Sequence, residues 1–513
     1  MKHATTVRVA LVAGFFLMLE ALARFGIVSK RSLVAPSDMI VRLADLMQHR
    51  PFWDALAYTA LSIVVALGLA VVAGFAGGVI LHRLPRTRRA LEPLIASYYA
   101  LPFFVLYPLF IVLWGMNAIP IIFVGFIYAV MAMLTATLSG LDRIPAVFRR
   151  SGRIFQLSPW REALLIQLPA ATPYLLTGIK LALGYAITGV IGSEFILSNN
   201  GFGYAIAYAY NAFDDRTMYA LLLFLIVLVT VVTALLHTAE RSAHHRSGAV
   251  KIEERQASLR ERAIAGLVVL IVLFAGWELL HWRVGDEALA APGATFRRLG
   301  EFLAGGTDFW ANVAETGKAL GLSLLISCVA GIIGGVMIGL SRAATAIIGP
   351  ILVTLYALPK VTLYPVVLLF FGIGLSAKVA FGALYGMIPM ILITINAITS
   401  MNPVYARAAR MMNLTRSQRF FTLILPATLP EIIGGLRISF SITLLGVMIG
   451  EMFASRRGLG FMIMNSMAVN DTATMMAVTV LVGVFAVAMN RLLTSLDARL
   501  LGRADVPPLA QPA

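Results

Sequence analysis

The chain has 513 residues and a formal net charge of +16 at pH 7, and 59% of its residues are hydrophobic while only 13% are charged. A soluble domain carries roughly 25% charged residues, and the mean hydropathy here is +0.87. This composition excludes a soluble globular protein. We attribute the positive charge to loops on the inner side of a membrane, not to a nucleic-acid surface.

Apolar stretches near the roughly 20 residues that cross a bilayer recur about twelve times along the chain. We therefore predict an all-α polytopic membrane protein with about twelve transmembrane helices. The spans expected in the first half are 7–27, 58–81, 93–115, 118–140, 173–197 and 218–238. Those expected in the second half are 263–282, 316–340, 349–372, 376–398, 430–452 and 474–493.

Three features outside this pattern are informative. The first span follows a basic start and has no A-x-A-like cleavage site, so we expect an uncleaved anchor, not a signal peptide. The charged stretch 239–262 is expected to be a cytosolic linker, and its His244 and His245 lack a nearby third metal ligand. Cys328 is the only cysteine, which excludes an intrachain disulfide and a cysteine-based metal site.

The second half of the chain repeats the first at a constant offset of 257 positions. YALPKVTLYPVVLLFFG at 356–372 corresponds to YALPFFVLYPLFIVLWG at 99–115, and LPATLPEIIGG at 425–435 corresponds to LPAATPYLLTG at 168–178. The register continues through helices and loops for about 150 residues, which indicates gene duplication.

Each copy has an even number of expected spans, so both copies enter the membrane from the same side. The prediction is two parallel six-helix repeats, related by an axis along the membrane normal, with a path between them. Arginines gather in the loops after the second and fourth spans, which places those loops and both termini inside. The expected divisions are repeat one at 1–238, the linker at 239–262, repeat two at 263–498 and a tail at 499–513.

A long inner loop joins the fourth and fifth spans of each copy, at 141–172 and 399–429. In each loop a basic segment with apolar residues at helical spacing precedes Leu-Pro-Ala and a second proline. We expect a short amphipathic helix on the membrane surface, ended by the prolines, which also start the next helix. Such a helix suits a cytosolic partner. Its candidate residues are Arg149, Arg150, Arg153, Phe155, Trp160, Leu168, Pro169, Arg407, Arg410, Arg416, Phe420, Leu425 and Pro426.

Lys360 is the most unusual residue within a span. It follows Pro359, in a segment whose prolines should break the helix, and its counterpart in the first copy is Phe103. Facing a cavity between the halves, it would give an asymmetric positive site for an anionic group. The alternative is that it satisfies backbone carbonyls freed by the proline, or extends to water.

Glu194 and Glu451 occupy matching positions near the outer ends of the fifth spans. They are candidates for a gate or an interface, and the alternative is a helix-end glutamate that faces outer water. The residues proposed for the transport path are Tyr99, Pro102, Phe103, Glu194, Tyr356, Pro359, Lys360 and Glu451.

Together these motifs resemble those of bacterial ABC-importer permeases of the nitrate, sulfonate and taurine type. The long inner loop is similar to that family's E-A-A-x-x-x-G loop with its following I-x-L-P. The blocks at 99–115 and 356–372 resemble the family's third-span block. GSEFILSNNGFG at 192–203 and IGEMFASRRGLG at 449–460 resemble its glutamate-containing end of the fifth span and its G-L-G turn.

In both copies the loop has lost the glutamate and the glycine of the family pattern. The E-A-A triplet falls on residues 150–152 in the first copy and 407–409 in the second, with arginine in place of glutamate. Gln156 and Asn413 stand at the glycine position. The ion pairs expected at this joint must therefore differ from those of the family.

The resemblance implies a translocation subunit of an ATP-driven importer in the bacterial inner (plasma) membrane, multi-pass, with both termini cytoplasmic. The solute would be small and anionic or heteroaromatic: a sulfonate, nitrate, taurine or a vitamin precursor. The implied partners are two copies of a separate ABC ATPase, which hold ATP and magnesium, and an extracytoplasmic substrate-binding protein. The chain lacks the G-x-x-x-x-G-K-[ST] phosphate loop, so we expect no enzymatic activity and no cofactor in it.

A secondary transporter of the major facilitator type is the alternative, because it also has two six-span halves and a charged linker. Such a transporter carries a basic signature between spans two and three, where HRLPRTRR at 82–89 lacks that family's glycine and aspartate. It also has no long Leu-Pro loop between spans four and five. Loop placement therefore favours the ABC permease.

Overall fold

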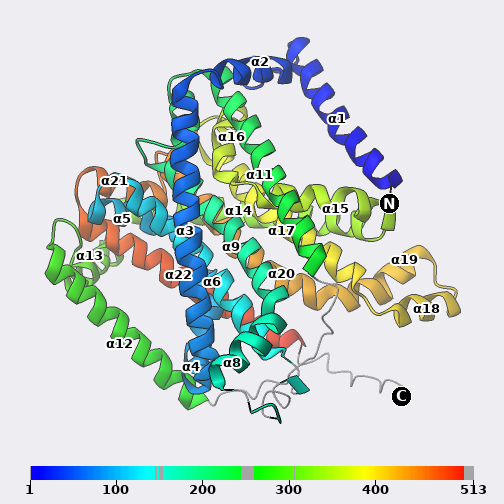
Figure 1. The fold of residues 1–513 in the computed structure, drawn as a ribbon. Coiled ribbons are helices and arrows are strands. Elements are labelled where there is room, and N and C mark those ends of the chain that lie inside the picture. The colour runs from blue at the N-terminus through cyan, green and yellow to red at the C-terminus, as the bar shows by residue number, and fades with distance from the viewer. Residues whose placement is uncertain are drawn as a thin grey trace.

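The computed structural model describes residues 2–29, 31–144, 147–148, 154–156, 158–243, 259–305 and 307–501. Over this part of the chain the secondary structure is helical, with no β-strand (Figure 1). The predicted all-α polytopic fold is confirmed.

The elements of the first half are α1 (Lys2–Arg24), α2 (Pro36–Leu46), α3 (Arg50–Arg83), α4 (Pro85–Tyr98), the 3-10 turn η1 (Phe103–Leu106), α5 (Tyr107–Trp114), α6 (Ala118–Asp142), α8 (Pro159–Glu162), the π-helical turn η2 (Ala163–Gln167), α9 (Leu168–Ile196), α10 (Phe202–Asn211) and α11 (Asp215–Ala243).

The elements of the second half are α12 (Leu259–Val284), α13 (Pro292–Gly305), α14 (Thr307–Gly339), α15 (Arg342–Ala357), the 3-10 turn η3 (Lys360–Leu363), α16 (Tyr364–Phe371), α17 (Leu375–Thr399), α18 (Pro403–Met411), α19 (Arg416–Arg419), the π-helical turn η4 (Phe420–Ile424), α20 (Leu425–Phe453), α21 (Leu459–Ala468) and α22 (Thr472–Leu501). From α3 and α14 onward, counterpart elements that are described in both halves begin 257 positions apart.

Ten helices in the described residues are long and apolar enough to cross a membrane, or up to eleven if a bent pair counts as one span. The sequence predicted about twelve. The difference lies in the third spans expected at 93–115 and 349–372, which are not single helices. Their apolar parts are shorter than a bilayer-crossing helix, because each segment is broken near its prolines.

The break in the third span is the clearest confirmed expectation about local structure. α15 ends at Ala357, and the chain bends by 92° before it continues as η3 and α16. Pro359 precedes η3 and Pro365 lies in the first turn of α16, where a missing N–H is tolerated. The first three residues of each turn are buried, in line with the need to cover irregular backbone at membrane depth.

Small residues allow the central helices of each half to approach closely. In the first half α6 packs against α3 and α9, and in the second α17 packs against α14 and α20. A Cβ atom on Gly189 of α9 would lie only 2.8 Å from the Cα atom of Gly125 on α6. The equivalent crossing uses Gly382 and Gly446. Only glycine permits this helix–helix distance.

The first helix of each half packs against the other half. α1 contacts α15, and its Arg8 donates from Nη2 to the Ala346 carbonyl oxygen at 2.8 Å. The counterpart α12 contacts α4. Figure 1 shows α1 and α12 at opposite edges of the molecule, and both expose almost all of their apolar side chains. These two helices therefore tie the halves together while they face lipid.

The sequence did not predict α2 and α13, which are too short and too polar to be read as spans. Each is held by an arginine staple, which we define as Arg42 with Asp214 and Thr217, or Arg298 with Asp471 and Thr474. The Nε atoms of Arg42 and Arg298 each donate to the threonine hydroxyl at 2.9 Å. The aspartates accept from the same threonines, at the first turns of α11 and α22.

We expect the arginine staples to make the stability of the fold depend on pH. Partial burial raises the pKa of Asp214 and Asp471, but hydrogen bonds from the threonines and the arginine charges outweigh it, so both pKa values lie below their usual range. A carboxylate with a lowered pKa stabilises the fold above its unfolded pKa, about 3.9, and this contribution disappears as the pH falls through the folded pKa.

The double variant Asp214→Asn/Asp471→Asn should therefore have a lower Tm than the wild type near about pH 6, and the gap should narrow near about pH 3. Thermal unfolding of both proteins in the same detergent measures this. A gap in Tm that is equal at the two pH values would show that the staples contribute no pH-dependent stability.

Candidate functional site

A cavity of about 290 Å³ lies between the two halves of the chain. The first half lines it from α6, α9 and α11, and the second half lines it from α15, the break after α15, α17 and α20. Of the described side chains that line it, none is acidic. Its charged and aromatic residues are Lys180, Lys360, Tyr128, Tyr185, Tyr356 and Tyr385.

Lys360 is buried at this cavity, with 6% of its surface exposed. Its Nζ atom lies 4.7 Å from the centre of the Tyr356 ring and 5.3 Å from that of Tyr385. The same ammonium donates to the Tyr356 carbonyl oxygen at 3.2 Å. The two readings of Lys360 are therefore compatible: it binds a carbonyl beside the helix break, and it lines the space between the halves.

The equivalent position in the first half shows what Lys360 replaces. Phe103 packs against Tyr128, with ring centres 5.8 Å apart, and Tyr128 is the counterpart of Tyr385. An aromatic pair in one half thus corresponds to an ammonium–aromatic pair in the other. The cavity lining is chemically asymmetric although the backbone is repeated.

The other predicted path residues divide into two groups. Tyr356 lines the cavity, whereas Pro102, Phe103 and Pro359 are buried in the breaks beside it. Tyr99 stacks on the cavity residue Tyr185 at 5.6 Å. Sequence reasoning missed Tyr128, Tyr185 and Tyr385. The retained pair Tyr128 and Tyr385, 257 positions apart, was the available signal.

Glu194 and Glu451 lie away from the cavity, in what we call the glutamate clamps. Thr59 donates its hydroxyl to Glu194 at 2.8 Å, and the N–H of Gly203 donates to the same carboxylate at 3.0 Å. The second clamp is the same: Thr316 and Gly460 donate to Glu451 at 2.9 and 3.0 Å. Each carboxylate thus links the end of a long helix to the turn that begins α10 or α21.

The clamps are closed to solvent, since Glu194 and Glu451 are almost completely buried. The alternative of a helix-end glutamate facing water is therefore wrong. Phe195 directly follows Glu194, and Phe453 lies two residues after Glu451. Their rings stack across the two halves with centres 4.6 Å apart. The clamp end of the interface is thus closed by aromatic packing.

The second clamp has an added charge that the sequence analysis did not single out. Lys378 lies 3.2 Å from Glu315 and 3.7 Å from Glu451, and it donates to the Arg457 carbonyl oxygen at 2.6 Å. The counterparts of Lys378 and Glu315 are Ile121 and Tyr58. A lysine in an apolar span with an apolar counterpart was the signal, as it was for Lys360.

The clamps predict a strong requirement for glycine at Gly201 and Gly458. Their φ angles are +104° and +126°, and an added Cβ would lie 2.3 and 2.2 Å from the glutamate Cδ. Gly458→Ala should therefore lower the free energy of unfolding by about 2–4 kcal/mol through backbone strain and steric overlap.

Gly285→Ala is the matched control for this substitution. Gly285 also has a positive φ, +81°, but no atom lies within 4 Å of the added Cβ. Gly285→Ala should therefore lower the free energy of unfolding only by the cost of the left-handed backbone conformation, about 1 kcal/mol. Denaturant unfolding of the two variants measures the difference, and equal losses would show that the clamp does not constrain the turn.

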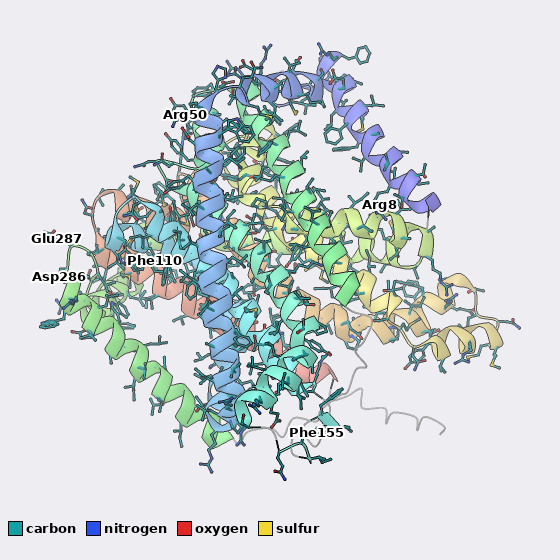
Figure 2. All side chains as sticks on the ribbon, in the orientation of Figure 1. Arg8, Arg50, Phe110, Phe155, Asp286 and Glu287 are labelled. Atoms are coloured by element: carbon teal, nitrogen blue, oxygen red, sulfur yellow. The ribbon has the colours of Figure 1, made fainter. Side chains whose placement is uncertain are left out.

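The two long loops lie at the end of the molecule opposite the clamps. Figure 2 shows Phe155 at this loop end, far from Arg50 at the other end. The predicted amphipathic helix of the second loop is present as α18, which leaves Met411 86% exposed. Beyond it, Phe421 is 63% exposed, and in the first loop Phe155 is 73% exposed. Both loops therefore present apolar side chains outward.

The predicted loop residues differ in exposure, and only some of their side chains belong to the described part of the chain. Arg407, Leu168, Pro169 and Pro426 are exposed, whereas Phe420 and Leu425 are half-buried. Trp160, Arg410 and Arg416 lie in α8, α18 and α19, and their side chains are outside the described part. The predicted Arg149, Arg150 and Arg153 lie outside the described residues.

The prediction that prolines separate two helices in these loops is wrong. α8 continues through η2 into α9, and α19 continues through η4 into α20. A π-helical turn precedes Pro169 and Pro426, and Pro173 and Pro430 lie inside the long helices. The wider π turn accommodates the missing proline N–H, so the helix continues.

Gln156 and Asn413, at the glycine position of the resembled loop, both have a φ of +48°. The left-handed turn has been kept although the glycine has been lost. Gln156→Gly should therefore stabilise the protein by about 1 kcal/mol, and Asn413→Gly by less, because asparagine tolerates this conformation better.

Thermal unfolding and limited proteolysis of the loops test this expectation. The control is Gln418→Gly in α19, which should destabilise by about 1 kcal/mol or more, because it lowers helix propensity and removes the oxygen that accepts from the Thr415 N–H and hydroxyl. A loss of stability in Gln156→Gly would contradict the assigned backbone conformation.

Comparison with known proteins now identifies the architecture. The profile of the family described as binding-protein-dependent transport system inner membrane component matches residues 43–244 and 329–502. The chain belongs to this family. The matched segments fall one in each half, as duplication requires, and the chain is the multi-pass permease subunit of an ABC importer. The resemblance seen in the sequence is confirmed, and the major-facilitator alternative is set aside.

Individual relatives correspond to about half of the chain. The taurine transport system permease protein of Escherichia coli is 29% identical over 198 residues, 39% of this chain and 70% of the relative. The formylaminopyrimidine transport permease protein of Halalkalibacterium halodurans is 27% identical over 204 residues, 39% of this chain and 80% of the relative. The nitrate import permease protein of Leptolyngbya laminosa is 25% identical over 249 residues, 47% of this chain and 88% of the relative.

Proposed function

We propose that this single chain supplies both halves of the translocation path of an ATP-driven importer. The observation that supports this most directly is the cavity whose wall is built from both halves. In a permease made of separate subunits two chains would meet there. One copy of this chain would then suffice for each transporter.

The transported solute is small, and anionic or heteroaromatic. The relatives named for taurine, nitrate and formylaminopyrimidine support this range. A cavity with two lysines and four tyrosines in its lining is compatible with it.

Energy comes from two copies of a separate ABC ATPase, which hold ATP and magnesium and dock on the loop end. The exposed apolar residues of both loops, Phe155, Met411 and Phe421, support docking there. The loop end and both termini then face the cytoplasm. An extracytoplasmic binding protein delivers the solute to the other end, near α2 and α13.

The continuous helices provide a mechanical link between the loops and the path. α19, η4 and α20 form one rod from the second loop to the cavity residues Ile442 and Leu445, and on to the clamp. α8, η2 and α9 do the same in the first half. When the ATPases close, the rods move together, and Phe195 separates from Phe453 to open the clamp end.

The docking assignment is tested by charge substitution on the exposed apolar side chains of the second loop. Met411→Asp/Phe421→Asp should reduce co-purification with the ABC ATPase encoded nearest to it by about tenfold or more, because a charge replaces buried apolar contact. ATP hydrolysis in liposomes should no longer respond to the permease.

Phe213→Asp is the matched control. Phe213 is 83% exposed, in the connection between α10 and α11 at the other end, and this substitution should leave ATPase binding unchanged. Equal losses for both variants, or ATP-independent uptake driven by an ion gradient alone, would overturn the proposal.

A further inference from the structure

We propose that the inter-repeat cavity is a solute-binding site in the permease itself, selective for a single-ring aromatic anion that pairs with Lys360. This inference rests on the proposed function, since it places a solute on the path between the halves. The inference goes beyond the proposed function because it assigns selectivity for the solute to this chain and not only to the binding protein that delivers the solute.

The first argument is charge. Lys180 and Lys360 line the cavity, and none of the described lining residues is acidic. No carboxylate of the described chain lies within 4.0 Å of the Lys360 ammonium. The ammonium donates one hydrogen bond, to the Tyr356 carbonyl oxygen, and its other neighbours are the Tyr356 and Tyr385 rings, so it can still donate to an anion. The charge of the described lining is therefore positive, which favours an anion over an ammonium group.

The second argument is hydrogen bonding. The phenol oxygens of Tyr128 and Tyr385 are buried and have no hydrogen-bond partner among the described residues. Both tyrosines line the cavity, one from each half. Buried polar groups are normally paired, so these two hydroxyls and the ammonium in the same lining can each donate to an anionic acceptor. A carboxylate or sulfonate has enough oxygens to accept from all three.

The third argument is size and shape. A cavity of about 150 Å³ holds a benzene molecule, so about 290 Å³ is room for one ring with its anionic group. The remaining lining is aliphatic and aromatic, including Tyr185, which already stacks on Tyr99 at 5.6 Å. A planar ring has matching surfaces to contact here.

Packing alone does not require a lysine at this position. The equivalent Phe103 fills its place in the first half, against a tyrosine in the same geometry. A buried lysine that an aromatic residue could replace points to a role in binding and not in folding.

Binding is measured on the purified full-length chain in lipid nanodiscs, by the rise in Tm on addition of sodium benzoate, sodium nitrate or benzylammonium chloride. Benzoate should raise the Tm, nitrate less, and benzylammonium not at all. In Lys360→Phe, which copies the first half, the apparent Kd for benzoate should rise about tenfold or more. Lys360→Arg should keep most of the affinity.

Two further sets of variants complete the test. Tyr128→Phe and Tyr385→Phe should each weaken benzoate binding severalfold, because each removes one donor. Arg437→Met is the control, since Arg437 is the counterpart of Lys180 in the repeat and does not line the cavity; it should bind benzoate as the wild type does.

The proposal is overturned if benzoate gives no shift, if benzylammonium binds as well as benzoate, or if Lys360→Phe binds benzoate unchanged. Nitrate binding as tight as benzoate binding would refute the aromatic part. Because binding is measured without an ATPase, its failure leaves the proposed transport function open. Loss of ATPase coupling with intact benzoate binding would instead refute only the transport mechanism.

Discussion

The architecture depends on one constraint: backbone polar groups that leave a helix inside a membrane must be covered by protein, because lipid offers no hydrogen-bond partner. The prolines of the third span interrupt its helix in both halves, and the exposed backbone must then be buried. The chain buries it at the junction of the halves, where η3 contacts α9 and η1 contacts α20. The cavity lies next to these turns. The need to bury the broken backbone therefore places the candidate binding site at the junction of the halves.

Duplication separates the parts of the protein that hold shape from the parts that define chemistry. The hydrogen bonds of the glutamate clamps, the arginine staples, the π-helical turns and the left-handed loop conformation recur in both halves, while Lys378 and Glu315 are added to the second clamp only. The residues at and beside the cavity differ between the halves. Lys360 is equivalent to Phe103 in the repeat, and Tyr185 is equivalent to Ile442. Symmetric positions are constrained by the fold, whereas the asymmetric ones are free to fit an asymmetric solute.

Much of this organisation could be predicted from sequence because it depends on composition and local rules. Apolar length predicted most spans, and paired prolines predicted the third-span breaks. The roles of Glu194 and Glu451 could not be predicted, since their partners Thr59 and Thr316 are 135 residues away in sequence. α2 and α13 were missed because amphipathic helices on a surface lack the long apolar run that identifies a span. The prolines Pro169 and Pro426 led to a wrong prediction of a helix break. A π-helical turn accommodates each proline within a continuous helix, and such a turn has no clear signature in the sequence.

The exchange of first helices has a consequence for biogenesis. α4, in the first half, packs against α12, which follows the linker, while α1 waits for α15 in the second half. During synthesis the first half is therefore complete in sequence before α1 and α4 can make these two contacts. The ribosome must produce about the length of one further helix before α4 is covered, and several more before α1 is. A chain that ended after the first half would lack the partners of both α1 and α4, so the lateral packing of the first half depends on the second.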